Sequence, residues 1–247
     1  MPDPVFLYFV KFFSDEAHAD QFRAGKLYAN RLSYFQDLED KCTEGRSDRN
    51  EAVAAWLQPE ETTIIIQDIS GNKFEITKND LAAPVSMSFN VYGNWPVFCV
   101  HAIYLDGFDN KDGEILLNAE DVPRFEKQLD VDDKCSKFGN FAVIVSAAQF
   151  VERLRNEVLR ASKKCAFGLV KYYNPSTFNG VFSLKEIPFH KHDKFAYKRE
   201  FRFCFPTDDS GNDALILDIG DISSFSCKVE AGKINNHLRI IYRGDPI

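Results

Sequence analysis

The amino-acid sequence predicts a mixed α+β fold built mainly from antiparallel sheets with a few helices. Segments rich in β-branched and aromatic residues outnumber the amphipathic segments with helical spacing, and the two kinds do not alternate regularly along the chain. A parallel, doubly wound sheet is therefore not expected. The chain has 247 residues, 45% of them hydrophobic, with no internal repeat, low-complexity tract or proline-rich linker. We therefore expect residues 1–247 to form a single domain.

The N-terminal part of the chain is expected to begin with a strand followed by a helix. Val5–Phe13 has the β-branched and aromatic content of a strand. Ser14 is a favourable N-cap for the next helix, which we expect to end near Gly25, because glycine commonly terminates helices. Extended structure is expected to resume over Leu27–Leu32.

Two features of the region that follows indicate a helix start and a hairpin. Asp48 has Glu51 three residues later and an alanine-rich apolar run behind it, which is the spacing of a capping box, so a helix is expected to begin near Asp48. The strand-like runs Thr62–Ile66 and Lys73–Thr77 flank Ser70-Gly71-Asn72. Gly and Asn tolerate positive φ, so these runs are expected to form a β-hairpin.

The rest of the chain is expected to contain two helices and several more strands. In Ala147–Ala161, apolar residues share one face of a helix, opposite a charged face. They are Phe150, Val151, Leu154 and Val158. A shorter helix is expected at Asn118–Leu129. Runs rich in β-branched and aromatic residues predict strands at Val85–Val91, Val97–Leu105, Phe141–Val145, Cys165–Tyr173, Val181–Ile187, Tyr197–Phe205, Ala214–Ile219 and His237–Tyr242.

Composition and charge narrow the classes of protein to which the chain can belong. The net charge of -7 excludes a surface that coats polyanions throughout, although a local basic cleft is compatible with it. The cysteines form no C-x-x-C pair, so neither a disulfide framework nor a zinc site is expected. The first residues lack the basic region and cleavage site of a signal peptide, and their apolar run is too short to span a membrane, which predicts a cytoplasmic protein.

The sequence lacks the familiar motifs of nucleotide-phosphate binding, serine hydrolases and metalloproteases. One short cluster could begin a metal site, because His190 and His192 lie two residues apart and Asp193 follows them. The remaining histidines form no motif with this pair, so a solvated loop is the better interpretation of the segment. We therefore expect no bound metal.

The strand expected at Tyr197–Phe205 carries the first candidate functional residues. With a period of two, one face presents mainly aromatic side chains, and Lys198, Glu200 and Arg202 lie on the other. One interpretation is a half-buried strand whose solvent-facing charges pair with one another. The other is catalytic: neighbouring positive charge depresses the pKa of a carboxyl group, so Arg202 would hold Glu200 ionised. Glu200 and Arg202 are the candidate catalytic residues.

A second candidate lies around the expected helix start, where Arg46 and Arg49 are interleaved with Asp48 and Glu51. A capping box accounts for both carboxylates without any function. It does not account for the two arginines, which would also suit contacts to a phosphate or a ribose. Arg46, Asp48 and Glu51 are therefore candidate binding residues.

The order of these features resembles a widespread bacterial family of uncharacterised proteins, in which an early N-D-P-x-E element and a late E-x-E-x-R strand bracket the chain. The resemblance covers most of the chain. It includes the step Phe22-x-x-Gly25-x-Leu27-Tyr28, followed by Tyr34-Phe35. Ser47-Asp48-Arg49-Asn50-Glu51 stands in the place of the early element, and Lys198-Arg199-Glu200-Phe201-Arg202 in the place of the late one.

The same layout is similar, more distantly, to the ADP-ribosyltransferase fold, and this resemblance implies a site for NAD. In that fold the first strand carries an Arg or a His, a second strand follows a helix and a glycine, and a late strand supplies a catalytic glutamate. Lys11 stands at the first-strand position, Tyr28 and Asn30 on the second strand, and Glu200 at the catalytic position. Tyr28 and Tyr34 would stack on the nicotinamide.

The resemblance implies that the chain transfers ADP-ribose from NAD, which is then a substrate, to a nucleic-acid or protein acceptor. Proteins of this kind often act as toxins or phage-defence effectors, so a neutralising antitoxin would be a partner. No membrane partner is expected. A nucleic-acid acceptor would require a local basic groove. The candidates for that groove are Arg46, Arg49, Lys191, Lys194, Lys198 and Arg199.

Two functions from other classes remain open on sequence alone. In one, Asp48, Glu51, Glu200 and Arg202 form a buried structural ion network in a non-catalytic interaction or regulatory module. In the other, Asp48, Glu51 and Glu200 are ligands of Mg²⁺ in a nuclease or nucleotide hydrolase. A pocket shared by the first-strand, second-strand and catalytic positions would favour NAD. Convergent carboxylates would favour a metal, and a closed arrangement would favour the module.

Overall fold

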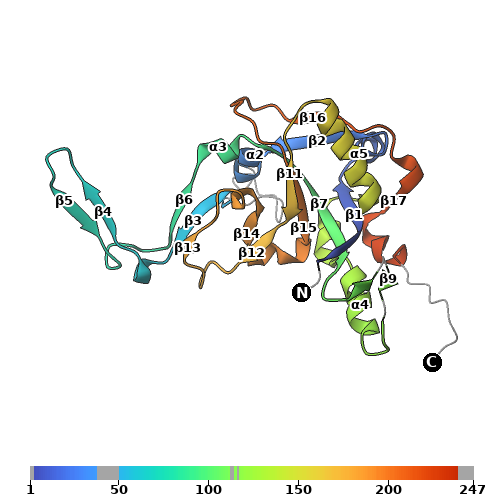
Figure 1. Cartoon of the computed structure of the whole chain (residues 1–247), viewed down its shortest axis with the longest axis horizontal. Coiled ribbons are helices and arrows are strands. Elements are labelled where there is room, and N and C mark those ends of the chain that lie inside the picture. The colour runs from blue at the N-terminus through green and yellow to red at the C-terminus, as the bar shows by residue number, and fades with distance from the viewer. Residues whose placement is uncertain (1–2, 38–49, 112–113, 116, 239–247) are drawn as a thin grey trace.

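The structure is a computed structural model of the chain, and it describes residues 3–37, 50–111, 114–115 and 117–238. It has a mixed α+β architecture in which most strands pair antiparallel, as the sequence predicts (Figure 1). The organisation as a single domain stays a prediction. No helix among these residues has both the length and the apolar character needed to cross a membrane.

The largest sheet contains eight strands and carries most of the core. Its main path runs β11-β15-β7-β1-β10-β17, and β2 joins it by pairing with β7 on one side and with β16 on the other. The strands, in chain order, are β1 (Val5–Phe13), β2 (Lys26–Arg31), β7 (Pro96–Leu105), β10 (Phe141–Ser146), β11 (Ala166–Leu169), β15 (Glu200–Cys204), β16 (Leu215–Asp218) and β17 (Ser226–Glu230).

The sheet divides at β7, because two strands share one edge of it. β2 pairs with the start of β7 through Asn30 and Val97, whereas β1 pairs with its end from His101 onward. β15 pairs along the opposite edge of β7 from Val97 to His101. In between, the carbonyl of Cys99 accepts a hydrogen bond from Lys11 Nζ at 2.7 Å. We call this divergence of β1 and β2 from β7 the fork.

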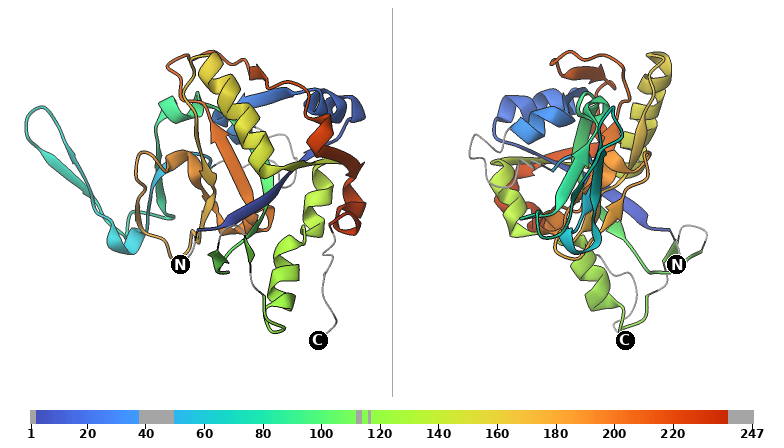
Figure 2. Two further views of the ribbon diagram at one scale, coloured as in Figure 1. Left: turned by 45° about the vertical axis from the view of Figure 1, so that its right-hand side comes forward. Right: turned by 90° about the vertical axis from the view of Figure 1, so that its left-hand side faces the viewer.

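The core on one face of this sheet is built largely from phenylalanine rings. Helices α1 (Glu16–Arg23) and α5 (Ala147–Arg160) cover this face, and Figure 2 shows α5 lying across it. Phe150 of α5 packs on rings of the strands beneath it, with centroid distances of 6.0 Å to Phe9 and 5.6 Å to Phe203. Burial of apolar surface of this kind is the main favourable term in folding.

Leu154 provides a test of this packing, because it lies on the buried face of α5 and is 2% exposed. Leu154→Ala should lower the free energy of unfolding by about 2–5 kcal/mol, since it removes buried methyl groups and leaves a cavity. Leu159 lies on the same helix but is 67% exposed. Leu159→Ala should therefore change stability by less than about 0.5 kcal/mol. Urea denaturation measures both, and equal losses would contradict the orientation of α5.

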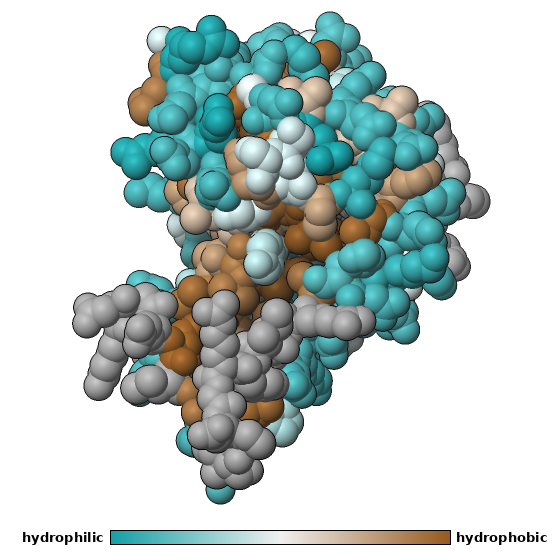
Figure 3. Space-filling view, turned by 90° about the vertical axis from the view of Figure 1, so that its right-hand side faces the viewer, coloured by the Kyte–Doolittle hydropathy of each residue, from teal (hydrophilic) through white to brown (hydrophobic). Residues whose placement is uncertain are grey.

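The opposite face of the sheet carries a second apolar cluster. Ile103 of β7 and Ile144 of β10 belong to it, and side chains from η3 (Asp133–Phe138) and η7 (Ala231–Asn236) pack over them. Figure 3 shows the face of the molecule that lies at the right of Figure 1, where hydrophilic residues cover the upper part and apolar residues form a band below them. Apolar packing therefore covers one face of the main sheet under α1 and α5, and part of the opposite face.

A smaller sheet, in the order β13-β3-β6, lies beside the main one. Its strands are β3 (Val53–Leu57), β6 (Val85–Ser88) and β13 (Gly180–Val181). Asp48, where a helix was expected to begin, lies outside the described residues, but the alanine-rich run after it forms β3, so the helical interpretation of that run is wrong. Residues 53–56 are all buried. A strand buried on both faces has a continuous apolar sequence, which periodicity does not separate from a helix.

Between β3 and β6 the chain forms a hairpin that projects away from both sheets (Figure 1). Its strands β4 (Ile64–Gln67) and β5 (Lys73–Ile76) pair antiparallel, which confirms the hairpin predicted from the sequence. Asp68 closes the turn, because its carboxylate accepts hydrogen bonds from the N–H groups of Ser70 and Asn72.

The remaining elements are short and connect or cover the sheets. Parallel pairing occurs between β12 (Lys171–Tyr173) and β14 (His190–His192). The other elements are α2 (Leu32–Asp37), α3 (Asn90–Gly93), α4 (Val122–Leu129), β8 (Asn110–Lys111), β9 (Glu114–Ile115), and the 3-10 helices η2 (Pro59–Glu61), η4 (Ile187–Phe189), η5 (Asp193–Lys198) and η6 (Ser223–Phe225).

Some predicted boundaries in the N-terminal half are wrong for local reasons. Asp15 rather than Ser14 caps α1, since its carboxylate accepts a hydrogen bond from the Ala17 N–H at 2.7 Å. The strand expected at Val85–Val91 ends at Ser88, because Ser88 pairs with the first residue of β3 and the chain then turns into α3.

In the C-terminal half, expected strands are interrupted where the chain moves between sheets. Cys165–Tyr173 divides into β11, which pairs with β15, and β12, which pairs with β14. Val181–Ile187 is extended only at its start, in β13, and its last residue begins η4. Strand β17 lacks a predicted counterpart. His237–Tyr242 lies mostly outside the described residues.

Candidate functional site

A cavity of about 350 Å³ lies at the fork between β1, β2 and β7. Side chains from β14, β15 and the turn before β3 complete its wall. The predicted site residues that the structure describes all line this cavity: Lys11, Tyr28, Asn30, Tyr34, Glu51, Glu200 and Arg202. Arg46 and Asp48 lie outside the described residues. The fork thus brings together side chains that are far apart in the sequence.

β15 supplies two charged residues to the cavity because its side chains alternate between two buried faces. Phe201 and Phe203 enter the phenylalanine core under α5, whereas Glu200 and Arg202 face the cavity. The predicted alternation is therefore present along this strand. All five residues of β15 are buried, so the alternative of a solvent-facing row of charges is wrong. The strand lies between β7 and β11 and has no exposed edge.

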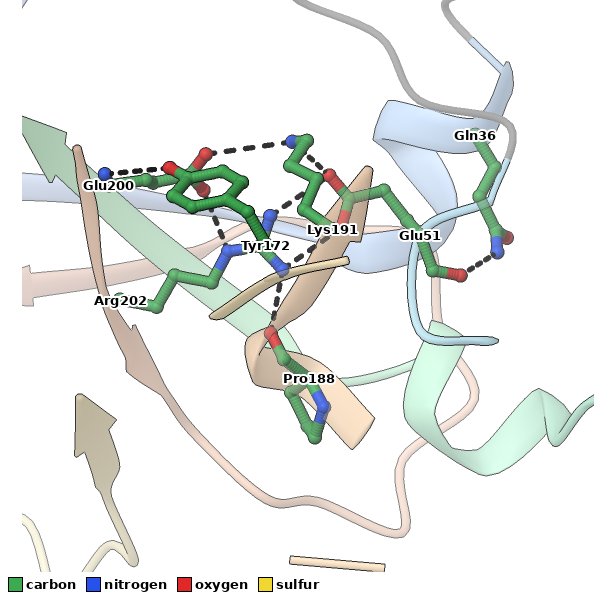
Figure 4. A network of polar contacts seen from close by, with 7 residues as sticks. All are labelled: Gln36, Glu51, Tyr172, Pro188, Lys191, Glu200 and Arg202. Carbon is green, nitrogen blue, oxygen red and sulfur yellow. Dashed lines mark hydrogen bonds and ion pairs between the residues drawn. The ribbon is translucent and has the colours of Figure 1, made fainter. Parts of the chain in front are cut away.

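Four charged side chains form a buried network in the cavity wall (Figure 4). Arg202 donates to Glu200 Oε1 through Nε at 2.6 Å and to Glu51 Oε1 through Nη2 at 2.9 Å. Its Nη1 donates to the carbonyl of Pro188 at 2.6 Å. Lys191 forms an ion pair with Glu51, and its Nζ lies 3.5 Å from Glu200 Oε2. The two carboxylates therefore share the same two cations.

Lys191 reaches the network because β14 alternates as β15 does. His190 and His192 point to the opposite side, where His190 stacks on Phe182 at a centroid distance of 4.0 Å and His192 meets Trp56 edge-on at 5.2 Å. The segment is a strand within the protein, so its interpretation as a solvated loop is wrong. In a strand, His190 and His192 share one face and Lys191 lies on the other. This alternation is the sequence signal that could have predicted Lys191 in the site.

The network keeps both glutamates ionised. Burial alone would raise the pKa of Glu200, but the positive charges of Arg202 and Lys191 outweigh it and hold that pKa well below its usual range. At Glu51 too, burial alone would raise the pKa, but the positive charges of Arg202 and Lys191 outweigh it, and the pKa of Glu51 is lowered. At neutral pH both carboxylates therefore carry a negative charge and can stabilise a positive one.

Two neutral side chains fix the backbone of the glutamates (Figure 4). The hydroxyl of Tyr172 accepts a hydrogen bond from the N–H of Glu200 at 3.0 Å. The amide of Gln36 donates to the carbonyl of Glu51 at 2.6 Å. Because Tyr172 lies on β12 and Gln36 on α2, elements outside the main sheet hold each glutamate in place.

The backbone is strained next to both buried glutamates. Ala52 follows Glu51 with a φ of 56°, and Arg199 precedes Glu200 with a φ of 40°. Non-glycine residues rarely adopt a positive φ, and strain of this kind costs about 1–3 kcal/mol and gathers at functional sites. The turn at Arg199 ends η5, so the strand expected from Tyr197 begins only at Glu200.

Two buried polar atoms in the cavity wall have no hydrogen-bond partner among the described residues. One is Glu51 Oε2, which is close to Arg202 Nη1 at 2.9 Å but accepts no hydrogen bond. The other is His101 Nε2. Buried polar atoms are usually satisfied, so such atoms mark places where a ligand or water can bind. Tyr28 and Tyr34 also line the cavity, and they are 59% and 46% exposed.

Among the described residues that line the cavity, positive charges outnumber negative ones. The cations are Lys11, Lys191, Lys198 and Arg202, and the carboxylates are Glu51 and Glu200. The chain as a whole has a net charge of -7, so the cavity has the opposite sign from the molecule around it. A cavity lined in this way attracts an anionic ligand.

His101 should make the stability of the fold depend on pH. Burial, followed by the charge of Arg199, lowers its pKa from 6.5 to about 4. As the pH falls, this histidine is therefore protonated in the unfolded chain before it is protonated in the folded chain. The free energy of unfolding then decreases between about pH 6.5 and about pH 4, by about 3 kcal/mol in total. Urea denaturation at several pH values measures this loss. His101→Gln should reduce it, and an equal loss in the variant would contradict the burial of a neutral imidazole.

The residues predicted to form a basic groove do not gather on the surface. Lys191 and Lys198 are buried, with exposures of 3% and 9%, and Arg199 donates to two backbone carbonyls. Lys194 is exposed. The described candidates for a basic groove therefore do not form one on the surface, because burial directs two of these charges to the cavity. The candidates outside the described residues are Arg46 and Arg49.

The arrangement of the carboxylates does not favour a site for Mg²⁺. Glu51 and Glu200 are paired with Arg202 and Lys191, and these cations compete with a metal for the carboxylate oxygens. Asp48, the third carboxylate of that hypothesis, lies outside the described residues. Within the part of the chain that the structure describes, no group of three or more His, Cys, Asp or Glu side chains could hold a metal ion.

Comparison of the chain with protein-family models, with curated proteins and with solved structures found no match. The resemblance to the bacterial family and to the ADP-ribosyltransferase fold therefore stays a prediction. What the chain does must be argued from the residues of the cavity, their charges and their positions at the fork.

Proposed function

We propose that the chain is an ADP-ribosyltransferase that uses NAD as its substrate, with the cavity at the fork as the binding site. The observation that supports this proposal is the meeting of Lys11, Asn30 and Glu200 in one cavity. They come from β1, β2 and β15, which correspond to the first, second and late strands of the fold that the sequence resembles. A metal site or a closed structural module does not require these three residues to share a cavity.

The size and lining of the cavity fit part of a dinucleotide. Its volume of about 350 Å³ lies at the lower end of the range of small-molecule sites, which is roughly 300–1,000 Å³. The exposed rings of Tyr28 and Tyr34 offer flat surfaces on which a base can stack. Glu51 Oε2 has unused capacity to accept a hydrogen bond, which suits a ribose hydroxyl.

The chemistry requires a fixed negative charge near the ribose. In the transfer, the bond between ribose C1′ and the nicotinamide nitrogen breaks, and its electron pair leaves with nicotinamide. A lone pair of the acceptor forms the new bond to C1′, and the acceptor loses its proton. Positive charge develops on the ribose meanwhile, and Glu200 would stabilise it as the catalytic residue. Arg202 acts as a positioning residue, because its Nε holds Glu200 Oε1 at 2.6 Å.

Transfer of label from NAD tests the proposal. The chain is incubated with cell extract and with NAD labelled in its adenylate half, and protein and nucleic acid are then separated. The proposal expects label in one of the two fractions, and that fraction identifies the acceptor. A role as a toxin or phage-defence effector, with an antitoxin as partner, would be examined only after that result. Absence of label from both fractions would contradict the proposal.

A second candidate function is a non-catalytic interaction module in which the charges serve only the fold. The observation that favours it is the mutual pairing of Glu51, Glu200, Arg202 and Lys191, all of which are buried. Buried charge networks can contribute to the specificity of a fold. In this case substitutions in the network change stability, and the cavity has no preferred ligand.

A further inference from the structure

Lys198 occupies a position in the cavity wall that the ion network does not explain. It is 9% exposed, and its ammonium group has no hydrogen bond or ion pair with any residue that the structure describes. Its nearby groups are aromatic: Nζ lies 4.4 Å from the ring centroid of Phe195 and 5.3 Å from that of Phe138. Aromatic rings attract a cation, but they do not replace its hydrogen bonds.

His101 lies at the same end of the cavity. The backbone of Lys198 is close enough to the imidazole to affect the pKa of His101, and His101 is the register partner of Glu200 across β7 and β15. His101 is 5% exposed, and its Nε2 has no partner among the described residues. Lys198 Nζ and His101 Nε2 are polar atoms of buried side chains that line one cavity, and they have no hydrogen-bond partner among the described residues, which points to a ligand group that contacts both.

Lys198 carries its charge at neutral pH. Burial lowers its pKa to about 8, and the charge of Lys191 adds to this effect, whereas Glu200 and Glu51 oppose it. Removing an ammonium group from water without a counterion or hydrogen bonds is costly. An anion bound beside it would remove that cost. The excess of cations in the cavity lining acts in the same direction.

We propose that the end of the cavity at Lys198 and His101 is an anion subsite that binds a phosphate group of the ligand. Lys198 supplies the positive charge and donates hydrogen bonds to the phosphate oxygens. His101 donates a further hydrogen bond to a phosphate oxygen when its neutral imidazole carries the proton on Nε2. The subsite rests on the proposed function in one respect, the identity of the molecule that carries the phosphate. In NAD this phosphate belongs to the diphosphate that joins the two halves of the molecule.

Titration calorimetry with three probes at neutral pH tests the subsite. Inorganic pyrophosphate and ADP-ribose carry phosphate, and nicotinamide riboside lacks it. Lys198→Met removes the ammonium group at similar length and should weaken binding of the two phosphate probes by about tenfold or more. Binding of nicotinamide riboside should stay within about twofold of wild type. The Tm of the variant without ligand should equal or exceed that of wild type, because an unpaired buried charge is removed.

Lys194 offers a matched control for this substitution. It belongs to the same helix, η5, and its Nζ lies 4.8 Å from the centroid of the same Phe195 ring. It is exposed, however, and does not line the cavity. Lys194→Met should change each Kd by less than about twofold. The subsite is overturned if both variants lose affinity equally, if Lys198→Met keeps wild-type affinity, or if the wild-type chain does not bind pyrophosphate.

Failure of the subsite and failure of the transferase proposal give different results. If binding of pyrophosphate depends on Lys198 but NAD is not cleaved, the subsite stands and the transferase proposal fails. If NAD is cleaved and Lys198→Met leaves KM for NAD unchanged, the subsite is overturned and the transferase proposal stands. Binding of pyrophosphate and cleavage of NAD are measured on the same protein preparations, so that each outcome can be assigned to one of the two proposals.

Discussion

Glu200→Gln should lower the rate of ADP-ribose transfer from NAD by about 10²- to 10³-fold per folded molecule. Gln keeps the size of the side chain and an oxygen that accepts the hydrogen bond from Arg202, but it removes the negative charge. The developing positive charge on the ribose then loses its preorganised counter-charge, and a loss of this size is typical when one such contact is removed. Label transfer and Tm are measured on the same preparation.

The control for this prediction must separate activity from stability, because Glu200 also pairs with Arg202 and Lys191. Glu200→Gln leaves these two cations with one carboxylate fewer, so its Tm should fall. Leu154→Ala is destabilised by an unrelated change in the core under α5, and it should transfer ADP-ribose at the wild-type rate per folded molecule. A Glu200→Gln variant that melts early yet transfers at that same rate would show that Glu200 serves the fold and is not the catalytic residue.

Arg202→Met should lower the free energy of unfolding at neutral pH by about 3–5 kcal/mol. Arg202 is 1% exposed, and it contacts both Glu200 and Glu51. Without it, Lys191 is the only ion-pair partner of the two buried carboxylates among the described residues, and Lys198 remains as a more distant positive charge. The pKa of Glu200 and of Glu51 should then rise, so acidification should narrow the difference in stability between the variant and wild type.

Lys26 provides the control for Arg202, because its ion pair with Asp218 is on the surface. The two side chains are 53% and 49% exposed, so Lys26→Met should lower the free energy of unfolding by about 1 kcal/mol or less. Chemical denaturation of both variants at pH 7 and at acidic pH gives the comparison. Similar decreases in the free energy of unfolding of the two variants would show that the buried network stabilises the fold no more than a surface ion pair does.

The parts of the fold that the sequence predicts well have patterns that are complete within one segment. The apolar stripe of α5 predicts Ala147–Ala161, and the helix spans Ala147–Arg160. The hairpin of β4 and β5 follows from its turn residues. β3 is predicted wrongly because its burial comes from the apolar cluster around it, which includes side chains of β7, β12 and η4, and none of these contacts is encoded in the local sequence.

The same distinction separates the site residues that could be predicted from those that could not. Glu200 and Arg202 alternate within one strand, so their pairing follows from the period of two. Glu51 and Lys191 meet them only after β3 and β14 have been placed beside β15 by long-range packing. His101 has no local signal, because its place in the cavity depends on the pairing of β7. Lys198 shares the expected face of Glu200 and Arg202, but it is the turn into β15 that brings it to the cavity wall.

Release of nicotinamide from NAD tests the central claim, that the cavity at the fork binds NAD and breaks its glycosidic bond. Free nicotinamide is quantified over time by chromatography with the wild-type chain and cell extract, and reactions without the chain provide the background. The account predicts release that increases with the amount of chain and falls about 10²- to 10³-fold with Glu200→Gln. Release no greater than background, or equal release by wild type and Glu200→Gln at matched folded fractions, would contradict it.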